Sequence, residues 1–379
     1  MRVLQFGRFW NEQYGGVERH VALLGKGLAA QGIDVVNLVA NVGLPSRDET
    51  AARYQLIQAW SFGMAYGTAL APALVLKALA LHQQEPFDLF HLHFPDPLSH
   101  LTSMMLPRNV PRVITWHSDI IRQKRLLALY KPFLQRIARQ ADALVAATQA
   151  HFDVSTQIPG DIPLERRHVI PYGLDYAPLA LQPRTTALRD DLRALAQGRG
   201  LVFALGRHVY YKGFDVLIDA MQHTDAFLIL GGDGPLRPQL EQQAMALGLS
   251  ERIFFAHRIP EEDLTAYFHA CDIFCMPSVE QAEAFGLVQL EAMACGKPVV
   301  CTQLNNGVNI VNIEGETGLA VPVRDPVALG KTLETLMQDA ASRLRLGQQG
   351  LRRANNVYSL PAMAASHINL YKTLVRLNK

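Results

Sequence analysis

The sequence predicts an α/β protein built from two successive domains, each with a parallel sheet. The chain has 379 residues, of which 49% are hydrophobic and 18% are charged, a composition typical of a chain that folds around a core. At roughly 150 residues per domain, this length accommodates two domains. Short apolar or β-branched runs alternate with helix-length segments along the chain. This alternation is typical of βαβ units and a parallel sheet.

The first series of expected strands lies in the N-terminal half of the chain. The strands are expected at residues 3–6, 35–39, 89–93, 113–116, 143–147 and 169–170. After residue 175 the alternation pauses in a polar stretch that contains proline and arginine. We place the domain boundary in this stretch, so the first domain is expected over residues 1–178.

A second series of expected strands follows the polar stretch. These strands are expected at residues 201–205, 227–230, 253–256, 273–276, 298–301 and 318–321, within a second domain over residues 179–360. The apolar spacing of residues 361–377 predicts an amphipathic helix. This C-terminal segment, residues 361–379, is a candidate for packing back on the first domain.

Charge and cysteine content exclude several classes of protein. The 36 Lys and Arg residues nearly balance the 34 Asp and Glu residues, so no global field favours a nucleic-acid partner. No pair of cysteines forms a C-x-x-C motif, which argues against a zinc ribbon, and buried reduced thiols suit a cytoplasmic protein. No signal peptide and no membrane-spanning helix are expected. The cysteines are Cys271, Cys275, Cys295 and Cys301.

In open parallel sheets, ligands bind beyond the carboxyl ends of the strands, so the loops after the strands carry the candidate sites. Gly15 and Gly16 follow the first strand and precede a helical run. Backbone N–H groups at a helix N-terminus favour a phosphate. A glycine pair by itself is equally typical of a tight turn.

Two cations follow the first strand of the second domain. Arg207 comes directly after Gly206, and Lys212 follows five residues later. Arginine binds phosphate oxygens with two parallel N–H bonds and lysine adds a compact charge, so the pair is suited to a diphosphate without a metal. In isolation, two such cations are also typical of a solvated surface.

The strongest signal is a loop acid, Glu283, followed by a second acid, Glu291, in a helix expected to begin near Gly286. The second acid lies about 7 to 8 Å along that helix, so the helix N-terminus lies between the two carboxylates. This layout suits a sugar hydroxyl at Glu283, a phosphate at the backbone amides around Gly286 and a ribose diol at Glu291. The alternative is an exposed acid and a helix-face acid with no shared ligand.

In order and spacing, these motifs resemble the retaining glycosyltransferases of family 4, which have the two-domain GT-B fold. The segment from Glu283 to Glu291, followed by Ala-Met-Ala-Cys-Gly-Lys-Pro-Val, resembles the E-x7-E signature of that family. The resemblance extends to the N-terminal Gly-Gly-Val-Glu and to residues 115–119, 170–175 and 231–235. It implies two Rossmann-like domains facing each other across a cleft. The first would bind the acceptor and the second the nucleotide-sugar donor.

The resemblance also implies roles for individual residues. Arg207 and Lys212 would hold the diphosphate, and His117 would lie near the anomeric centre. Arg258 and Ile259 would meet the base through their backbone, and Gly16 would offer an amide to the phosphate. The implied catalytic residues are His117, Glu283, Arg207 and Lys212. The implied donor-binding residues are Gly16, Arg207, Lys212, Arg258, Ile259, Glu283, Phe285, Gly286, Leu287 and Glu291.

No metal and no cofactor are expected in the reaction. No D-x-D motif stands at a strand end, so the Arg207 and Lys212 pair would replace a divalent ion, and the activity would be insensitive to EDTA. His91 and His93 form an H-x-H motif, but we expect no further cluster of histidines or carboxylates around them. We interpret both as strand and cleft-rim residues. The family's route is same-face attack by the acceptor hydroxyl, which gives an α product from an α donor.

The chain is similar to bacterial enzymes that add mannose or a related hexose to a lipid-linked surface polysaccharide. This similarity favours a GDP-sugar donor, GDP-mannose above all, and a lipid-linked or lipopolysaccharide glycan as acceptor.

Residues 121–140 contain no acid and are typical of a basic amphipathic helix, which can lie on an anionic membrane surface. The protein would then be peripheral on the inner face of the cytoplasmic membrane. The alternative is a solvated helix whose apolar side packs on the core. The cations of the segment are Arg122, Lys124, Arg125, Lys131, Arg136 and Arg139.

Several other functions stay open at this point. The donor could be a UDP-sugar used by an enzyme of the same family, or the chain could be a catalytically silent subunit that binds a nucleotide-sugar. A nucleotide-sugar epimerase is a further alternative, whereas a phosphorylase would need a pyridoxal lysine and a much longer chain. A dehydrogenase is disfavoured because Gly7 and Arg8 follow the first strand in place of a G-x-G-x-x-G turn.

Overall fold

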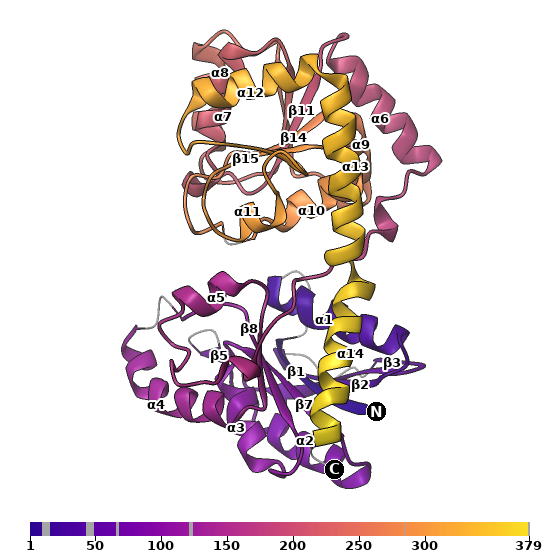
Figure 1. Ribbon diagram of the computed structural model, residues 1–379, viewed down its shortest axis with the longest axis vertical. Helices are drawn as coiled ribbons and strands as arrows, with labels where there is room; N and C mark the ends of the chain where they lie inside the picture. The colour runs from indigo at the N-terminus through magenta and orange to yellow at the C-terminus, as the bar shows by residue number, and fades with distance from the viewer. Residues whose placement is uncertain (10–15, 43–48, 66–67, 121–123, 284, 378–379) are drawn as a thin grey trace. The chain divides into compact units, whose positions relative to one another are not determined.

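The computed structural model describes residues 1–9, 16–42, 49–65, 68–120, 124–283 and 285–377 (Figure 1). The chain divides into two compact units. Unit 1 comprises Met1–Leu174 and Ser359–Lys379, and unit 2 comprises Asp175–Tyr358. The sequence predicts boundaries after residues 178 and 360, close to these positions. Unit 2 is therefore inserted between two segments of unit 1.

Unit 1 is built on an eight-stranded sheet with the order β10-β9-β8-β7-β1-β2-β4-β3. Neighbouring strands are parallel except for β3 and β4, which are antiparallel. A separate small hairpin is formed by β5 and β6. The strands are β1 (Arg2–Phe9), β2 (Asp34–Val42), β3 (Glu49–Ala51), β4 (Tyr54–Ser61), β5 (Met64–Ala65), β6 (Thr68–Ala69), β7 (Leu89–Phe94), β8 (Arg112–Trp116), β9 (Ala143–Ala146) and β10 (Arg167–Val169).

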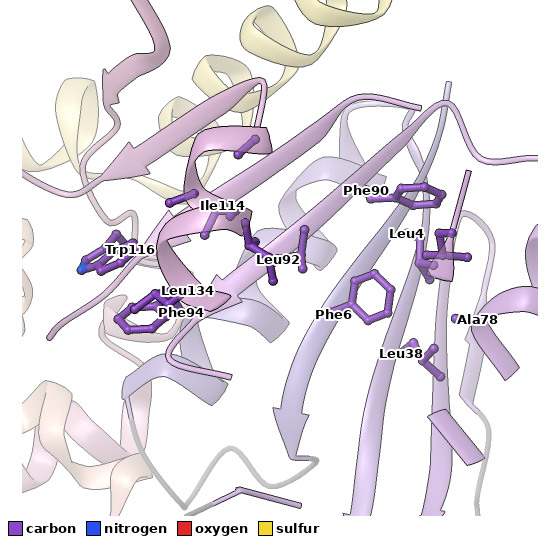
Figure 2. Packing of buried hydrophobic residues seen from close by; sticks show 14 of the residues in the cluster. Leu4, Phe6, Leu38, Ala78, Phe90, Leu92, Phe94, Ile114, Trp116 and Leu134 are labelled. Carbon is purple, nitrogen blue, oxygen red and sulfur yellow. The ribbon is translucent and has the colours of Figure 1, made fainter. Parts of the chain in front are cut away.

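Helices cover both faces of this sheet, so its central strands are buried on both sides. One face packs on α2, α4 and α5, and its core contains Phe6, Phe90 and Ile114 (Figure 2). The other face packs on α1 and α14, and its core contains Val3 and Val113. The helices are α1 (Gly16–Ala30), α2 (Ala73–Gln84), α3 (Pro97–Met105), α4 (Lys124–Gln140), α5 (Gln149–Val154) and α14 (Leu360–Leu377), with a 3-10 turn η2 (Leu164–Arg166).

The C-terminal helix α14 packs against α1 within unit 1 (Figure 1). The two helices approach closely at Gly27, where an added Cβ would lie 2.7 Å from Leu360 Cδ1. Buried Met363, Ile368 and Tyr371 join α14 to the core of the sheet. The segment that the sequence left as a candidate for packing on the first domain is therefore part of that domain's core.

Unit 2 contains a six-stranded, fully parallel sheet with the order β13-β12-β11-β14-β15-β16. Its strands are β11 (Leu201–Leu205), β12 (Phe227–Gly231), β13 (Ile253–His257), β14 (Ile273–Met276), β15 (Val299–Thr302) and β16 (Gly318–Val321). Its α-helices are α6 (Pro183–Leu195), α7 (Phe214–Ala220), α8 (Arg237–Ala246), α9 (Leu264–Ala270), α10 (Leu287–Ala294), α11 (Gly307–Val311), α12 (Pro326–Gln338) and α13 (Ala340–Val357). Its 3-10 turns are η3 (Ala177–Leu179), η4 (Tyr210–Lys212), η5 (Met221–His223) and η6 (Glu261–Asp263).

Every strand that the sequence predicts overlaps a strand of the structure, and the helices expected near Gly286 and over residues 361–377 are present as α10 and α14. The sequence missed β3 to β6. Cys271, Cys275 and Cys301 are buried as expected, whereas Cys295 is half-buried. Within the described residues, no helix is long and apolar enough to cross a bilayer.

Candidate functional site

The order in which strands are added to the sheet of unit 2 reverses between β11 and β14. These two strands are adjacent in the sheet although they are far apart in sequence. From β11 the chain builds outward to β12 and β13, and from β14 it builds the other way to β15 and β16. In open α/β sheets, the crevice outside the strand ends at such a switch point binds ligands. The loops that follow β11 and β14 flank this place, and they carry Arg207, Lys212 and Glu283.

The loop after β11 packs tightly against the loop after β12. At Gly232, with φ of +110°, an added Cβ would lie 1.9 Å from the carbonyl oxygen of Gly206. The backbone N–H of His208 donates to the carbonyl oxygen of Asp233 at 2.9 Å. The backbone that carries Arg207 is therefore fixed on both sides. The Arg207 side chain is exposed, and its guanidinium has no hydrogen-bond or ion-pair partner in the described part of the chain.

A second close approach joins Lys212 to the end of β14. Gly213 has φ of +66°, and an added Cβ would lie 2.1 Å from the carbonyl oxygen of Pro277. The backbone N–H of Val279 donates to the carbonyl oxygen of Tyr211 at 2.8 Å. Only glycine allows the two backbones to meet at this distance. The segment that carries Lys212 is thus held against the segment that leads to Glu283.

The Lys212 ammonium forms a hydrogen-bonded ion pair with the Glu283 carboxylate. The two side chains are only 14% and 11% exposed. The hydroxyl of Ser278 also donates to Glu283 Oε2 at 3.3 Å, and Asn306 Nδ2 donates to the main-chain oxygen of Glu283 at 2.7 Å. Residues to which the resemblance assigns separate roles, one at the diphosphate and one at the sugar, are therefore in direct contact here.

Helix α10 begins directly after this loop. Gly286 is its N-cap with φ of +66°, and an added Cβ would lie 2.7 Å from Met276 Sδ. Gln289 Nε2 donates to the carbonyl oxygen of Phe285 at 2.9 Å, which fixes the turn that leads into the helix. Leu287 is the first helical residue. The N-terminal amides of α10 are in this way held beside the Lys212 and Glu283 pair.

Glu291 lies one turn into α10 and is half-buried. By helix rise, it is about 6 Å beyond Leu287 along the axis. Burial, together with the charge on Glu291, raises the pKa of Tyr176 above its usual range. The hydroxyl of Tyr176 donates to the main-chain oxygen of Tyr358 at 3.0 Å. The Glu291 carboxylate is therefore near Tyr176, which is hydrogen-bonded to Tyr358, and these two residues lie near the start and at the end of unit 2 in sequence.

Arg258 and Ile259 follow β13 at the same end of the sheet. Arg258 is exposed and Ile259 is half-buried. Ile259 Cδ1 lies over Gly231, 2.6 Å from the place where a Cβ would stand. The backbone N–H of Gly232 donates to the carbonyl oxygen of His257 at 2.6 Å. The loops after β11, β12 and β13 are thus linked to one another, and the donor-binding residues expected in unit 2 all stand at one end of its sheet.

The remaining two expected site residues belong to unit 1. Gly16 is exposed at the start of α1, with no atom within 4 Å of an added Cβ, whereas Gly15 lies outside the described residues. His117 follows β8 and is buried. Its Nε2 is 3.0 Å from His93 Nδ1, and its Nδ1 is 2.9 Å from the Tyr172 hydroxyl. The ring of His20, from α1, lies edge-on to His117 with centroids 4.9 Å apart.

Burial controls the charge of these imidazoles. Loss of solvent lowers the pKa of His117 to about 3, and it lowers the pKa of His20 and His93 well below the usual range. The three side chains are therefore neutral at pH 7. In this state each imidazole offers one N–H donor and one lone pair.

Two expectations about the H-x-H motif are wrong. His91 and His93 are not rim residues, because their side chains are buried in unit 1. His91 Nε2 is 2.7 Å from Thr115 Oγ1, and its Nδ1 is 2.6 Å from the Tyr371 hydroxyl on α14. A further histidine cluster also exists, since His20 and His117 lie beside His93. Both partners come from other elements, so the H-x-H spacing alone cannot reveal them.

Helix α4 contains most of the basic segment. Its apolar side is packed into the core of unit 1 through Leu134, Ile137 and Ala138. Arg136 is exposed on the outer side, and so is Arg139, which pairs with Asp161 at 2.8 Å. Arg122 lies outside the described residues. The apolar side of α4 is thus packed in the core over its second half, as the alternative of a solvated, core-packed helix predicts, whereas Leu129 in its first half is 82% exposed.

The two units match two family descriptions. The one described as Glycosyltransferase Family 4 matches residues 14–177, and the one described as Glycosyl transferases group 1 matches residues 191–353. The D-rhamnosyltransferase WbpZ of Pseudomonas aeruginosa is 32% identical over 366 residues, which cover 95% of this chain and 92% of that protein. The chain belongs to glycosyltransferase family 4. The resemblance drawn from its motifs is confirmed.

Other comparisons place this family 4 glycosyltransferase among bacterial relatives and give its fold. The O-antigen chain mannosyltransferase C of Escherichia coli is 27% identical over 381 residues, which cover 99% of both chains. The crystal structure of HepE from Anabaena, in complex with UDP, has a TM-score of 0.74 at 21% identity and covers 99% of this chain and 100% of that one. The expected GT-B fold, with two parallel-sheet α/β domains, is confirmed.

Proposed function

We propose that this glycosyltransferase moves mannose or a related hexose from a GDP-sugar to a lipid-linked or lipopolysaccharide glycan, with retention of the α configuration. Two relatives that align with nearly the whole chain support the sugar and the acceptor, because they are named a D-rhamnosyltransferase and an O-antigen chain mannosyltransferase. The proposed reaction uses no divalent metal.

The observation that carries the proposal is the buried Lys212 and Glu283 pair at the switch point of unit 2. A nucleotide-sugar presents a dianionic diphosphate beside a neutral ring of hydroxyls. Lys212, the exposed Arg207 and the N-terminus of α10 supply positive charge for the diphosphate. Glu283 supplies an acceptor for sugar hydroxyls. One ligand of this chemistry uses every group at the site.

The same groups account for a reaction without metal. As the bond from the anomeric carbon to the phosphate breaks, negative charge grows on the departing phosphate oxygens. Cations already fixed near them stabilise that charge without reorganisation. Lys212 is held in this way by Glu283 and by the close approach at Gly213. We assign it and Arg207 the part that a divalent ion plays elsewhere.

In the proposed mechanism, the acceptor hydroxyl attacks the anomeric carbon on the face from which the phosphate leaves. The bond to the phosphate breaks, and the hydroxyl proton passes to the departing phosphate oxygen. We assign His117 a place at the sugar, where a neutral imidazole adds no charge. Glu291 would bind the ribose, and the backbone at Arg258 and Ile259 would bind the base.

A thermal-shift screen tests the donor. GDP, UDP, ADP and their hexose conjugates are added to the wild type, with and without EDTA, and to Arg207→Ala and Glu291→Ala. Arg199→Ala and Glu251→Ala serve as controls, because both residues are exposed and precede β11 and β13, so they lie at the amino ends of these strands and not at the carboxyl ends that carry the site. A ligand that binds the native state raises stability by RT ln(1 + [L]/Kd). GDP-mannose should stabilise the wild type and both controls with or without EDTA, and should lose its effect in the two site variants.

A specific observation favours a second candidate donor, because HepE was solved with UDP bound. A larger shift with a UDP-hexose than with GDP-mannose would replace the proposed donor. The absence of a shift with every nucleotide would remove the donor site itself.

Turnover with an α-linked donor then tests the chemistry: proton NMR of the product should show an α anomer. A β product would remove the retaining mechanism, and binding without any turnover would favour a silent sugar-nucleotide-binding subunit.

We also propose that the exposed basic side of α4 contacts anionic lipid. Since Leu134, Ile137 and Ala138 of this helix pack in the core, the contact at its outer side would be mainly electrostatic and would weaken with salt. Vesicle sedimentation with anionic and neutral lipids tests this for the wild type and for Arg136→Glu. Reversal of Arg199, an exposed cation in unit 2, is the matched control. Equal sedimentation of the wild type with both lipids would contradict the proposal.

A further inference from the structure

Three imidazoles from separate elements of unit 1 converge at one point. His20 comes from α1, His93 from β7 and His117 from the end of β8. One ring nitrogen of each lies within 4.8 Å of a ring nitrogen of the other two, and all three residues are buried. The distance from His93 Nδ1 to His117 Nε2 is 3.0 Å. Nitrogen atoms that ligate one tetrahedral ion at about 2.0 to 2.1 Å are separated by roughly 3.4 Å.

The cluster contains polar atoms that the protein leaves without partners. His20 Nε2 and His93 Nε2 are buried, and neither has a hydrogen-bond partner among the described residues. Burying a polar atom without a partner is unfavourable, so most buried nitrogens in native proteins have one. The unpaired His20 Nε2 can give its lone pair to a ligand, whereas the unpaired nitrogen of His93 is not the one that faces His117.

The donor set selects the kind of ligand. Three neutral imidazoles with an open fourth position are the protein ligands of many zinc sites. Imidazole nitrogen suits Zn²⁺, Co²⁺, Ni²⁺ and Cu²⁺, whereas Mg²⁺ and Ca²⁺ prefer oxygen. An outer contact is also in place, since the Tyr172 hydroxyl lies 2.9 Å from His117 Nδ1 and orients that ring.

We propose that His20, His93 and His117 form a binding site for a divalent transition-metal ion of the zinc class, and that the bound ion inhibits the transferase. On binding, the nitrogens that face one another turn their lone pairs to the ion, and the ring whose N–H lies between His93 Nδ1 and His117 Nε2 carries that proton on its outer nitrogen instead. Inhibition follows because the ion withdraws His117 from the donor sugar. The inhibitory part rests on the proposed function, whereas the binding part does not.

The binding part is tested without donor or acceptor. Zn²⁺ is titrated calorimetrically into the EDTA-treated, dialysed protein, and Co²⁺ is titrated while its visible ligand-field absorption is recorded. We expect one ion per chain and the intense spectrum of a tetrahedral site. His20→Gln and His93→Gln should each weaken binding at least about tenfold. His100→Gln is the matched control, because His100 is also buried in unit 1 but lies outside the cluster.

Circular dichroism of the metal-free variants checks that each one is folded before the titration. The absence of stoichiometric Zn²⁺ uptake by the wild type would overturn the proposal. So would equal uptake by His20→Gln and the wild type, since the ion would then bind elsewhere. A Co²⁺ spectrum typical of octahedral oxygen coordination would overturn it as well.

The inhibitory part is tested by the ratio of each protein's rate with Zn²⁺ to its own metal-free rate. For the wild type and for His100→Gln, the rate with Zn²⁺ should be at least tenfold below the metal-free rate, and adding EDTA should restore the metal-free rate. His20→Gln should show a ratio near one at the same Zn²⁺ concentration. Tetrahedral binding without a change in rate would refute the inhibition and leave the site. Failure to find any transferase activity would bear on the proposed function and not on the titrations.

Discussion

Replacing Gly213 by alanine tests whether the close approach between the η4 segment and the end of β14 builds the donor site. Gly213 follows Lys212 directly and has φ of +66°. Its Cα faces the carbonyl oxygen of Pro277, so an added methyl group would stand 2.1 Å from that oxygen and 2.8 Å from Val279 Cγ1. The two segments would have to separate, and Lys212 would move away from Glu283.

A matched control separates the two costs of this substitution. Gly248 has nearly the same backbone angle, φ of +69°, but no atom lies within 4 Å of an added Cβ. Alanine in this left-handed conformation costs about 1 to 2 kcal/mol, and Gly248→Ala should show this cost alone. Gly213→Ala adds the cost of overpacking, about 1 to 3 kcal/mol.

Thermal unfolding of the wild type and both variants measures the difference. At about 2 to 4 °C per kcal/mol for a domain of this size, the extra cost corresponds to a midpoint about 2 to 12 °C lower for Gly213→Ala than for Gly248→Ala. Calorimetric titration should also show nucleotide affinity at least about tenfold weaker in Gly213→Ala only. Equal midpoints, or unchanged nucleotide affinity in Gly213→Ala, would refute the reasoning.

Three further predictions concern single contacts. Lys212→Met leaves the Glu283 carboxylate buried without its cation and should lower the free energy of unfolding by about 3 kcal/mol. In a double-mutant cycle with Glu283→Gln, measured by urea unfolding, the losses of the two single variants should not add up to the loss of the double variant. Simple additivity would argue against the ion pair. Burial lowers the pKa of His100 from 6.5 to about 3, so the folded state binds fewer protons than the unfolded state, and the stability present above about pH 6.5 is lost as the pH falls. This loss is about 2 kcal/mol at pH 5; His100→Phe should reduce the difference between urea midpoints at pH 7 and pH 5, and an unchanged difference would contradict the assignment. Tyr371→Phe removes the hydrogen bond to His91 and should cost about 1 kcal/mol, seen as faster hydrogen exchange in α14, whereas unchanged exchange would show that the bond contributes nothing.

Most strands that the sequence predicts correctly appear as continuous apolar runs, and central ones such as β7, β12 and β14 are buried on both faces. The outer strands β10 and β13 are also predicted, although they are only partly buried. Strand β4 was missed since its burial alternates: Tyr54 and Leu56 are buried, whereas Gln55 and Trp60 are exposed. Strands β3, β5 and β6 have only two or three residues each, too short for any periodic signal. The sequence therefore reveals a strand where it forms a continuous apolar run, even where that run is only partly buried, as in β13.

The order of motifs predicts which residues gather in unit 2, but not the contacts that they make. Lys212 and Glu283 meet because β11 and β14 are adjacent in the sheet, and this pairing joins residues far apart in the chain. The histidine cluster is non-local in the same way. A signal was nevertheless present, because His93 and His117 both stand at the carboxyl ends of expected strands, and parallel neighbours bring such ends together.

The return of α14 to unit 1 has a consequence for how the protein is made. Domains generally fold during synthesis in the order in which they leave the ribosome. Here the whole of unit 2 is translated before α14, which takes roughly 10 to 40 s at 5 to 20 residues per second. During that interval, the side of the nascent sheet that holds Val3 and Val113 lacks α14, one of the two helices that cover it. The first unit to begin folding is thus the last to finish, and truncation of the C-terminus removes core from the N-terminal domain.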